Sequence, residues 1–423
     1  MQPKIISLAI FILAYILFVF FSTKRTLIAV CGSVVLIFLG VISPEQAFFA
    51  INWNVMGIFV GLQVVAGIVI ESRVPAYLAE IIVDRAKNTA WAILALCVLT
   101  GFISAFLDNV STVLIVAPIA LSLAKKLQIN PMKMMIAIAV SSNLQGTATL
   151  IGDPPSMLLG GFAKMNFMDF FFYHGKPSIF FAVELGALAS FVVLYFIFKG
   201  HRQKVPIVKV EKVQSWVPAG ILTALIVLLA ASSFVGTNFS YMAGLLCSIF
   251  GVGSILWWRF AKNNSVVDRI KSVDWNTAFF LMSVFVLVGS ITLTGWIDTI
   301  SDSLSKLVGE NIFLGYTLLV FISVLVSAFV DNIPFMAAML PVAISMSQRL
   351  GVNPSLFLFG LLIGTSLGGN ITPIGASANI VACGLLKKEG YHIRFSEFAK
   401  IGVPFTLVAV TAAYLFVWFV WNR

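Results

Sequence analysis

Residues 108–118 read DNVSTVLIVAP, and residues 331–341 read DNIPFMAAMLP. Each stretch places an Asp-Asn pair inside an apolar run, and the pairs Asp108-Asn109 and Asp331-Asn332 lie 223 positions apart. A carboxylate in lipid costs at least about 2.5–3.5 kcal/mol, so two matched copies indicate a repeated functional feature. We interpret each pair as the tip of a hairpin made of two short helices.

The chain around these tips has the composition of a membrane protein. Of its 423 residues, 60% are hydrophobic and only 10% are charged, whereas soluble domains carry about 25% charged residues. Apolar runs of helical length recur along the whole chain, which indicates that lipid is the solvent. The first run, residues 5–21, lacks a small-residue cleavage site, so we interpret it as a retained span and not as a signal peptide.

The apolar runs predict ten membrane spans, at about residues 5–22, 25–42, 53–71, 133–160, 177–198, 217–234, 241–258, 275–294, 355–385 and 401–421. Residues 90–126 and 313–347 contain the Asp-Asn pairs and are predicted as re-entrant hairpins that do not cross. Irregular backbone at membrane depth has to be buried in protein or line a cavity. Two amphipathic stretches, residues 74–87 and 297–310, are predicted to lie at the membrane interface.

The distribution of Lys and Arg supports this topology. With the N-terminus outside, 21 of the 27 basic residues, Lys24 and Arg25 among them, fall in cytoplasmic loops. The remaining six fall outside, namely Lys4, Lys164, Lys176, Lys306, Arg349 and Arg423. This bias follows the positive-inside rule only if both hairpins are non-crossing. We therefore expect a multi-pass protein of the cell (inner or plasma) membrane, with both termini outside.

The offset of 223 extends beyond the tips, because four further pairs keep it: Pro118 and Pro341, Pro131 and Pro354, Thr149 and Thr372, Gly152 and Gly375. Five crossings per half is an odd number, so the second half is predicted to run through the membrane inverted. The predicted fold is all-α, with one inverted repeat over residues 1–212 (hairpin 90–126, broken helix 133–160) and another over residues 213–423 (hairpin 313–347, broken helix 355–385). Such repeats place the binding site near the bilayer midplane, where discontinuous helices meet.

Each half also contains a long span that Pro and Gly interrupt, in TLIGDPPS around Gly152 and in ITPIGASAN around Gly375. Proline removes N–H donors, which leaves carbonyl groups able to coordinate a cation or a polar solute. We assign ion or proton coupling to Asp108, Asn109, Asp331, Asn332 and Asp153. Substrate or ion binding is assigned to Asn143, Gln145, Thr147, Thr149, Gly152, Ser156, Ser366, Asn370, Thr372, Gly375, Ser377 and Asn379.

Structural roles compete with these assignments. The two tip aspartates could be helix N-caps only, and the polar side chains at the breaks could serve only to satisfy freed backbone groups. No catalytic residue, cofactor or metal cluster is expected; a sodium ion at Asp108/Gly152 or at Asp331/Gly375, or a proton, is the expected coupling ion. The chain has no GxxxxGK[ST] loop, so an ion gradient or a separate ATPase subunit has to supply the energy.

At these motifs the chain resembles the ArsB/NhaD permease family of the ion transporter superfamily. The resemblance is carried by DNVST, IGDPPS, DNIPF, GGNITPIGASANIVACG and YHIRFSEFAKIG, and IGDPP with DNIPF and GASAN is especially similar to the P protein branch. It implies elevator-type alternating access and a homodimer. It also implies that the two Asp-Asn tips stand where sodium-coupled dicarboxylate relatives carry Ser-Asn-Thr, and an Asp there favours proton coupling or antiport.

The resemblance leaves the solute open. The leading hypothesis is proton-coupled efflux of an inorganic solute, with arsenite or antimonite first. The alternatives are sodium/proton antiport, sodium- or proton-coupled carboxylate or anion transport, and a channel; an enzyme is not expected. Cys383, just after the second break, could attract a thiophilic metalloid or be a small buried hydrophobe. The expected partners are lipid, the solute or ion and a second copy, with a separate ATPase subunit as the alternative to an ion gradient, and no nucleic acid.

Overall fold

The computed structural model describes residues 3–204, 212–234, 241–262, 265–309 and 311–422. Over these ranges the regular structure is helical apart from one short ribbon, in which β1 (Phe172–Tyr173) pairs antiparallel with β2 (Lys176–Pro177). Three single-turn 3-10 helices, η1 (Ser22–Lys24), η2 (Met168–Phe170) and η3 (Gly369–Ile371), lie between longer helices. The expectation of an all-helical membrane fold agrees with this arrangement.

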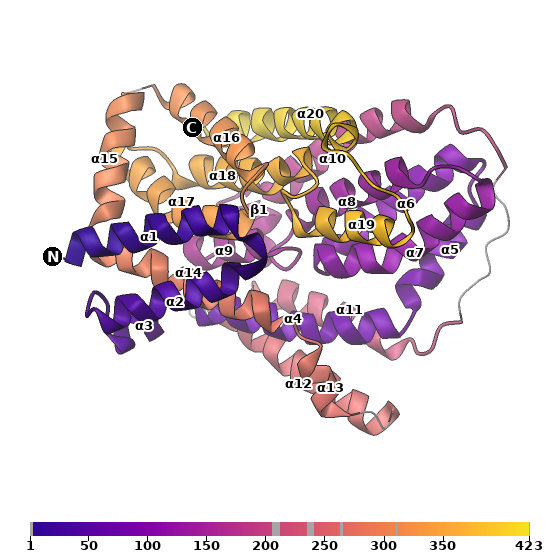
Figure 1. The fold of residues 1–423 in the computed structure, drawn as a ribbon, viewed down its shortest axis with the longest axis horizontal. Coiled ribbons are helices and arrows are strands. Elements are labelled where there is room, and N and C mark those ends of the chain that lie inside the picture. Colours follow the sequence, from indigo (N-terminus) through magenta and orange to yellow (C-terminus); the bar gives the residue numbers. More distant parts are fainter. Residues whose placement is uncertain (1–2, 205–211, 235–240, 263–264, 310, 423) are drawn as a thin grey trace.

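One group of helices forms an elongated layer, seen along the lower part of Figure 1. Its members are α1 (Pro3–Phe20), α2 (Arg25–Phe38), α3 (Pro44–Ala50), α4 (Trp53–Glu71), α11 (Val217–Ser232), α12 (Met242–Lys262), α13 (Val266–Lys271) and α14 (Trp275–Leu293). Helix α12 packs along α4, and α2 packs along α14. A Cβ added at Gly61 would lie 2.2 Å from the carbonyl oxygen of Cys247, so glycine allows the close approach of α4 and α12.

A second group forms the larger body. It contains α6 (Thr89–Ser104), α7 (Asn109–Leu127), α8 (Met132–Gly146), α9 (Pro154–Ala163), α10 (Ile179–Phe198), α16 (Ile312–Ser327), α17 (Asn332–Arg349), α18 (Pro354–Gly368), α19 (Ser377–Lys388) and α20 (Phe395–Trp421). Every residue of α18 from Ser355 to Gly368 is buried, as expected of a helix that is apolar all round. Helices α5 (Val74–Asp84) and α15 (Trp296–Val308) connect the two groups along the chain.

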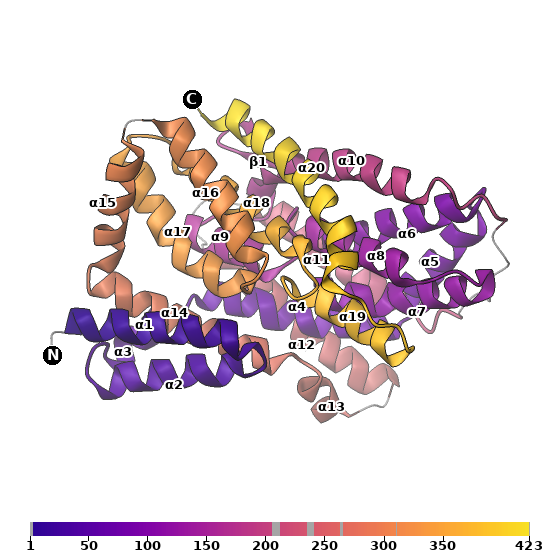
Figure 2. The same ribbon diagram turned by 45° about the horizontal axis from the view of Figure 1, so that its top comes forward.

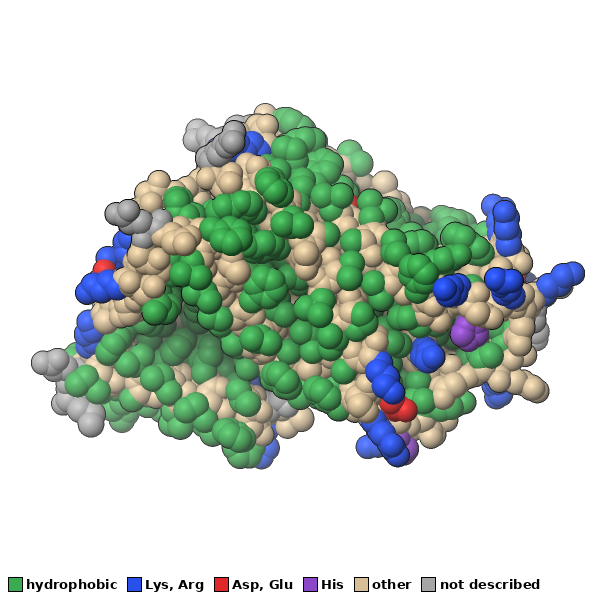
Figure 3. All heavy atoms as spheres, turned by 90° about the horizontal axis from the view of Figure 1, so that it is seen from above, with side chains coloured by type: hydrophobic (Ala, Val, Ile, Leu, Met, Phe, Trp, Pro, Cys, Tyr) green, Lys and Arg blue, Asp and Glu red, His purple; other side chains and the backbone are tan. Residues whose placement is uncertain are grey.

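Eight of the described helices are long and apolar enough to cross a membrane, or nine if the sharply bent pair α15–α16 counts as one span. The prediction of ten spans differs from this count at four places. Residues 25–42 and 217–234 form the shorter helices α2 and α11, and residues 133–160 form two short helices, α8 and α9, while α7 is counted as a span by its length. Figure 3 shows apolar side chains over the middle of one face, with Lys and Arg gathered toward its ends. The chain is therefore a multi-pass membrane protein.

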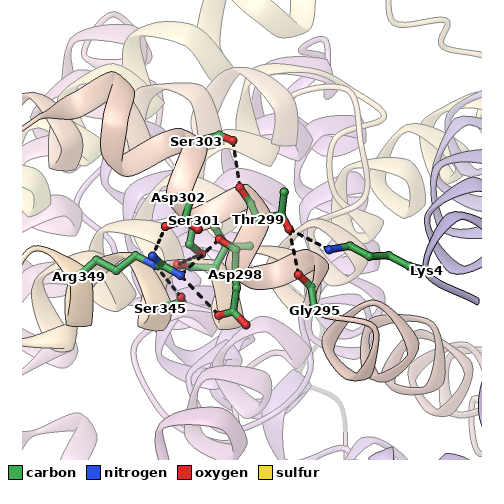
Figure 4. A network of polar contacts seen from close by, with 10 residues as sticks. Lys4, Gly295, Asp298, Thr299, Ser301, Asp302, Ser303, Ser345 and Arg349 are labelled. Atoms are coloured by element: carbon green, nitrogen blue, oxygen red, sulfur yellow. Dashed lines mark hydrogen bonds and ion pairs between the residues drawn. The ribbon is translucent and has the colours of Figure 1, made fainter.

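Both termini lie at the same end of the molecule (Figures 1 and 2). At this end the polar side of the amphipathic α15 contacts the C-terminal part of α17 (Figure 4). Arg349 of α17 forms an ion pair with Asp302, and its Nη2 lies 3.8 Å from a carboxylate oxygen of Asp298. The three side chains are 34%, 49% and 71% exposed, so each pair contributes only about 0–1 kcal/mol.

Candidate functional site

The two Asp-Asn tips lie between helices. Helix α6 ends at Ser104 and α7 begins at Asn109, while α16 ends at Ser327 and α17 begins at Asn332. Oδ1 of Asp108 accepts a hydrogen bond of 2.9 Å from the N–H of Ser111. The N-capping role weighed for this aspartate is therefore present, but it engages only one of the two carboxylate oxygens.

The second tip is capped in the same way. Oδ1 of Asp331 accepts a hydrogen bond of 3.0 Å from the N–H of Ile333. At the first break, Oδ1 of Asp153 accepts one of 3.0 Å from the N–H of Ser156 and caps α9. At the second break, α19 begins after Ala376 without any side-chain cap. Three of these four helix starts thus carry an Asp cap, and one does not.

At both breaks, glycines allow two backbone segments to lie in close contact. A Cβ added at Gly152 would lie 2.2 Å from the carbonyl oxygen of Gly146, and one added at Gly375 would lie 2.5 Å from that of Gly369. A Cβ at Gly146 would in turn lie 2.1 Å from Oδ1 of Asn109. The tip of the first hairpin therefore packs directly on the first break, and the glycines recur at the offset of 223.

Hydroxyl groups link each break to its hairpin. The hydroxyl of Thr149 donates to the carbonyl oxygen of Ala105, and that of Thr372 donates to the carbonyl oxygen of Ala328. These two threonines lie at matched positions and satisfy carbonyl groups at the ends of α6 and α16. Their contacts fit a structural role, the satisfaction of backbone carbonyl groups, better than ligand binding.

Asparagine side chains connect the two halves. Nδ2 of Asn143 lies 2.9 Å from Oδ1 of Asn370 and 3.0 Å from Oδ1 of Asn379. Oδ1 of Asn143 accepts from Nδ2 of Asn109 at 3.3 Å. Asn379 also donates to the carbonyl oxygens of Gly369 and Thr372, at 3.0 and 2.9 Å. The buried amides thus hold the first tip, the first broken helix and the second break together.

A cavity of about 360 Å³ lies where the N-termini of α7, α9, α14, α17 and α19 meet. Seven of the predicted site residues line it: Asp108, Asn109, Asn143, Asp153, Asp331, Asn332 and Ser377. Asn370 and Asn379 lie behind this lining and hydrogen-bond to Asn143. The cavity brings together both tips and both breaks.

Other predicted residues lie away from the cavity lining. Gln145 lines a separate cavity of about 150 Å³ beside Glu184. Thr147 donates to the carbonyl oxygen of Asn143 at 3.2 Å, and Ser156 donates to that of Thr147 at 3.3 Å. Ser366 is buried in α18. Among the described residues no His, Cys, Asp and Glu side chains gather as a group of three or more that could hold a metal, and Cys383 is not part of the cavity lining.

Two charged residues of the cavity, Arg25 and Asp274, were not predicted as site residues from the sequence. Arg25, which the charge count placed in a cytoplasmic loop, is the first residue of α2 and forms an ion pair with Asp331. Asp274 caps α14 through a hydrogen bond of 3.0 Å from the N–H of Thr277. A local Asp-x-x-Thr capping pattern could have identified Asp274, whereas nothing near Arg25 in the sequence points to its partner.

The lining is acidic. With Asp108, Asp153, Asp274 and Asp331 ionised, Arg25 leaves the described lining with a formal charge of −3. Oδ2 of Asp108 is buried, and no hydrogen-bond donor reaches it from the described parts of the chain. A buried carboxylate oxygen without a donor favours a bound cation or proton.

Comparison with known proteins gives a match over most of the chain. The family model described as "Citrate transporter" (CitMHS) matches residues 15–350 and 336–423. An uncharacterized transporter of Mycobacterium bovis is 29% identical over 426 residues, which cover 98% of each chain. The P protein of Homo sapiens is 26% identical over 490 residues, which cover 96% of this chain and 58% of that protein.

Two solved transporter structures have a similar fold. The Alcanivorax borkumensis YdaH transporter superposes with a TM-score of 0.62 at 12% identity, covering 99% of this chain and 98% of the other. Neisseria gonorrhoeae MtrF, described as illuminating a class of antimetabolite efflux pumps, superposes with a TM-score of 0.59 at 14% identity, covering 91% and 84%. At such identities the likeness concerns the fold alone.

Proposed function

This chain belongs to the citrate transporter family and is a secondary transporter, and we propose that it moves a small carboxylate or related anion together with a cation or proton bound at Asp108. The observation that carries the proposal is the unpartnered oxygen of Asp108 at the cavity. An ionisable group at membrane depth is costly unless it has a partner. A sodium ion or a proton would supply such a partner.

The starts of the two broken helices favour an anionic solute. Asp153 caps α9, but its counterpart at the offset of 223 is Ala376, which leaves the N-terminus of α19 without a side-chain cap. Ala376 and Ser377 line the cavity. A helix N-terminus attracts negative charge, so a carboxylate of the solute would take the place that Asp153 occupies in the first half.

Two earlier hypotheses remain as competitors. Sodium/proton antiport is favoured by the excess of carboxylates in the cavity, which would bind cations without any anion. Arsenite or antimonite efflux, with membership of the ArsB/NhaD group, stays a hypothesis, but no cysteine is found among the described residues that line the cavity. The family description therefore makes a carboxylate the first solute to test.

The transport cycle is proposed to be of the elevator type, within two inverted repeats. Support comes from the matched contacts of Gly152 and Gly375 and of Thr149 and Thr372 in the two halves. The division into a layer and a body supports relative movement of the two groups of helices. Both termini at one end of the molecule agree with the proposed outside location of both, and a homodimer in the cell membrane remains part of the proposal.

Purified protein in liposomes tests the proposal. Labelled citrate, smaller di- and monocarboxylates and arsenite are supplied one at a time, with the pH and sodium gradients varied independently. We expect saturable uptake of at least one carboxylate that requires one of the two gradients. Sodium/proton exchange without any solute would favour the antiporter, and uptake that neither saturates nor follows a gradient would favour a channel.

Replacing Ala376 by Asp is expected to lower carboxylate uptake at least about tenfold, a loss of about 1.4 kcal/mol in transition-state or binding free energy. The new carboxylate would cap α19 as Asp153 caps α9 and would repel the solute. Ala376→Asn is the matched control, because it offers a cap of similar size without charge. Equal uptake by the Asp variant and the wild type would contradict an anion site at this helix.

A further inference from the structure

We propose that the guanidinium of Arg25 is a built-in cation at the second tip, so that Asp331 binds no transported ion and coupling proceeds through Asp108 alone. This inference rests on the proposed function and goes beyond it, because it states why two matched aspartates provide only one coupling site. Arg25, the first residue of α2 in the layer of helices, would thus determine which tip binds the coupling ion.

The carboxylates of the two tips have different partners. In Asp331, Oδ1 accepts from the N–H of Ile333 and Oδ2 pairs with Nη1 of Arg25, so both oxygens are engaged. In Asp108, Oδ1 accepts from the N–H of Ser111, while Oδ2 is buried with no hydrogen-bond donor among the described residues. The guanidinium thus stands at the second tip where the first tip has an open position.

Arg25 is held in place by its surroundings. Its guanidinium lies over the ring of Phe280, 4.9 Å from the centroid, and Phe280 is fully buried. The neighbouring helix α1 contacts the same tip, because the hydroxyl of Tyr15 donates to the carbonyl oxygen of Pro334 at 2.6 Å. Cation–π contact and the ion pair together favour a fixed guanidinium over a freely moving one.

Asp274 is a further acidic residue close to this end of the cavity, and both of its carboxylate oxygens accept hydrogen bonds. Oδ1 of Asp274 accepts from the N–H of Thr277 at 3.0 Å, and Oδ2 accepts from the hydroxyl of Thr277 at 2.6 Å. These hydrogen bonds leave the negative charge of Asp274 in place, so Asp274 also attracts Arg25 electrostatically, while the direct ion pair of Arg25 is with Asp331. The direct contact of the guanidinium is therefore with the carboxylate of the second tip.

Among the described residues that line the cavity, Arg25 is the one basic residue, and it lies at the second tip. Helix α2 starts with Arg25 and packs on α14. In the corresponding position of the other half, α12 packs on α4. In α12 the basic residues are Arg259 and Lys262, at the C-terminal end of the helix, whereas Arg25 is the first residue of α2. The two tips therefore differ because Arg25, from the first half of the chain, pairs with Asp331 of the second tip.

The test uses purified full-length protein in liposomes and measures the number of cations moved per solute. Reversal potentials and the steepness of the cation dependence are compared for the wild type, Arg25→Gln, Asp331→Asn and the double variant. The expected result for Arg25→Gln is about one additional cation per cycle, since an unpaired carboxylate at membrane depth requires a replacement charge. The double variant, which removes both charges, should return to the wild-type stoichiometry.

Asp331→Asn alone leaves Arg25 unpaired, and we expect its transport rate to fall more than tenfold and to recover in the double variant. If Arg25→Gln is inactive, this recovery still decides the matter, with folding checked by size-exclusion chromatography. Unchanged stoichiometry in an active Arg25→Gln, or a double variant no better than Asp331→Asn, would overturn the inference.

Arg349→Gln is the control, because it breaks an exposed ion pair at the opposite end of α17 (Figure 4). It should leave the stoichiometry unchanged, and a change equal to that of Arg25→Gln would overturn the inference. A different variant, Asp108→Asn, tests the proposed function independently of this inference. Cation dependence that persists in Asp108→Asn would contradict the coupling site itself, whatever Arg25→Gln shows.

Discussion

Transport by Asp108→Asn is expected to lose its dependence on sodium or pH, and gradient-driven uptake should fall at least about 30-fold. Truncating one partner of a buried charge pair costs about 2–5 kcal/mol. In Asn, an uncharged NH2 group replaces Oδ2, and this hydrogen-bond donor cannot bind a cation. Folding should be preserved, because Asn caps a helix about as well as Asp, and the cap to Ser111 uses a single side-chain oxygen.

The measurement is initial uptake into liposomes at varied pH and sodium, with unfolding temperature as the check on folding. Asp302→Asn is the control, because this carboxylate is half-exposed on α15 and lies outside the cavity lining. Unaltered cation dependence in Asp108→Asn would mean that this aspartate serves only as a helix cap.

Gly152→Ala and Gly375→Ala should each abolish transport and lower the unfolding temperature. The new Cβ would lie 2.2 Å from the carbonyl oxygen of Gly146 in the first case and 2.5 Å from that of Gly369 in the second. Backbone atoms cannot rotate away as a side chain can, so the break would have to open. Overpacking of this kind costs about 1–3 kcal/mol. The backbone segment that would be displaced contacts the asparagines of the tips, Asn109 and Asn332.

Thermal unfolding in detergent and uptake in liposomes measure the two effects. Gly384→Ala provides the control, since a Cβ at this exposed position of α19 meets no atom within 4 Å. It should be neutral or stabilising by about 0.4–1 kcal/mol. Wild-type stability and uptake in both break variants would show that the close glycine contacts are not required.

The sequence alone led to the principal members of the candidate site. Carboxylates within apolar runs are costly, so Asp108 and Asp331 stood out by composition, and their constant offset linked them to Gly152 and Gly375. Proline and glycine interrupt a helix through local backbone chemistry, which is readable without a fold. For that reason seven predicted residues line one cavity.

The tertiary structure decided which residues act together. Gln145 shares the polarity of its neighbours, yet it faces a different cavity beside Glu184, because the face of a helix that a side chain occupies depends on packing partners. Asn143 contacts Asn370 across 227 positions of sequence. No local pattern specifies such a contact, since it depends on how the two halves are placed against each other.

The sequence by itself determined that this protein lies in a membrane and that a carboxylate stands in each Asp-Asn pair, and it predicted that the two halves are related. These conclusions follow from transfer free energies and backbone chemistry, which act on each residue locally. Only the tertiary structure distinguished the tips, by placing Arg25 on Asp331, 306 positions away, and leaving Oδ2 of Asp108 without a donor. Charge compensation depends on distances between side chains, and the packing of α2 and α17 on α14 sets those distances.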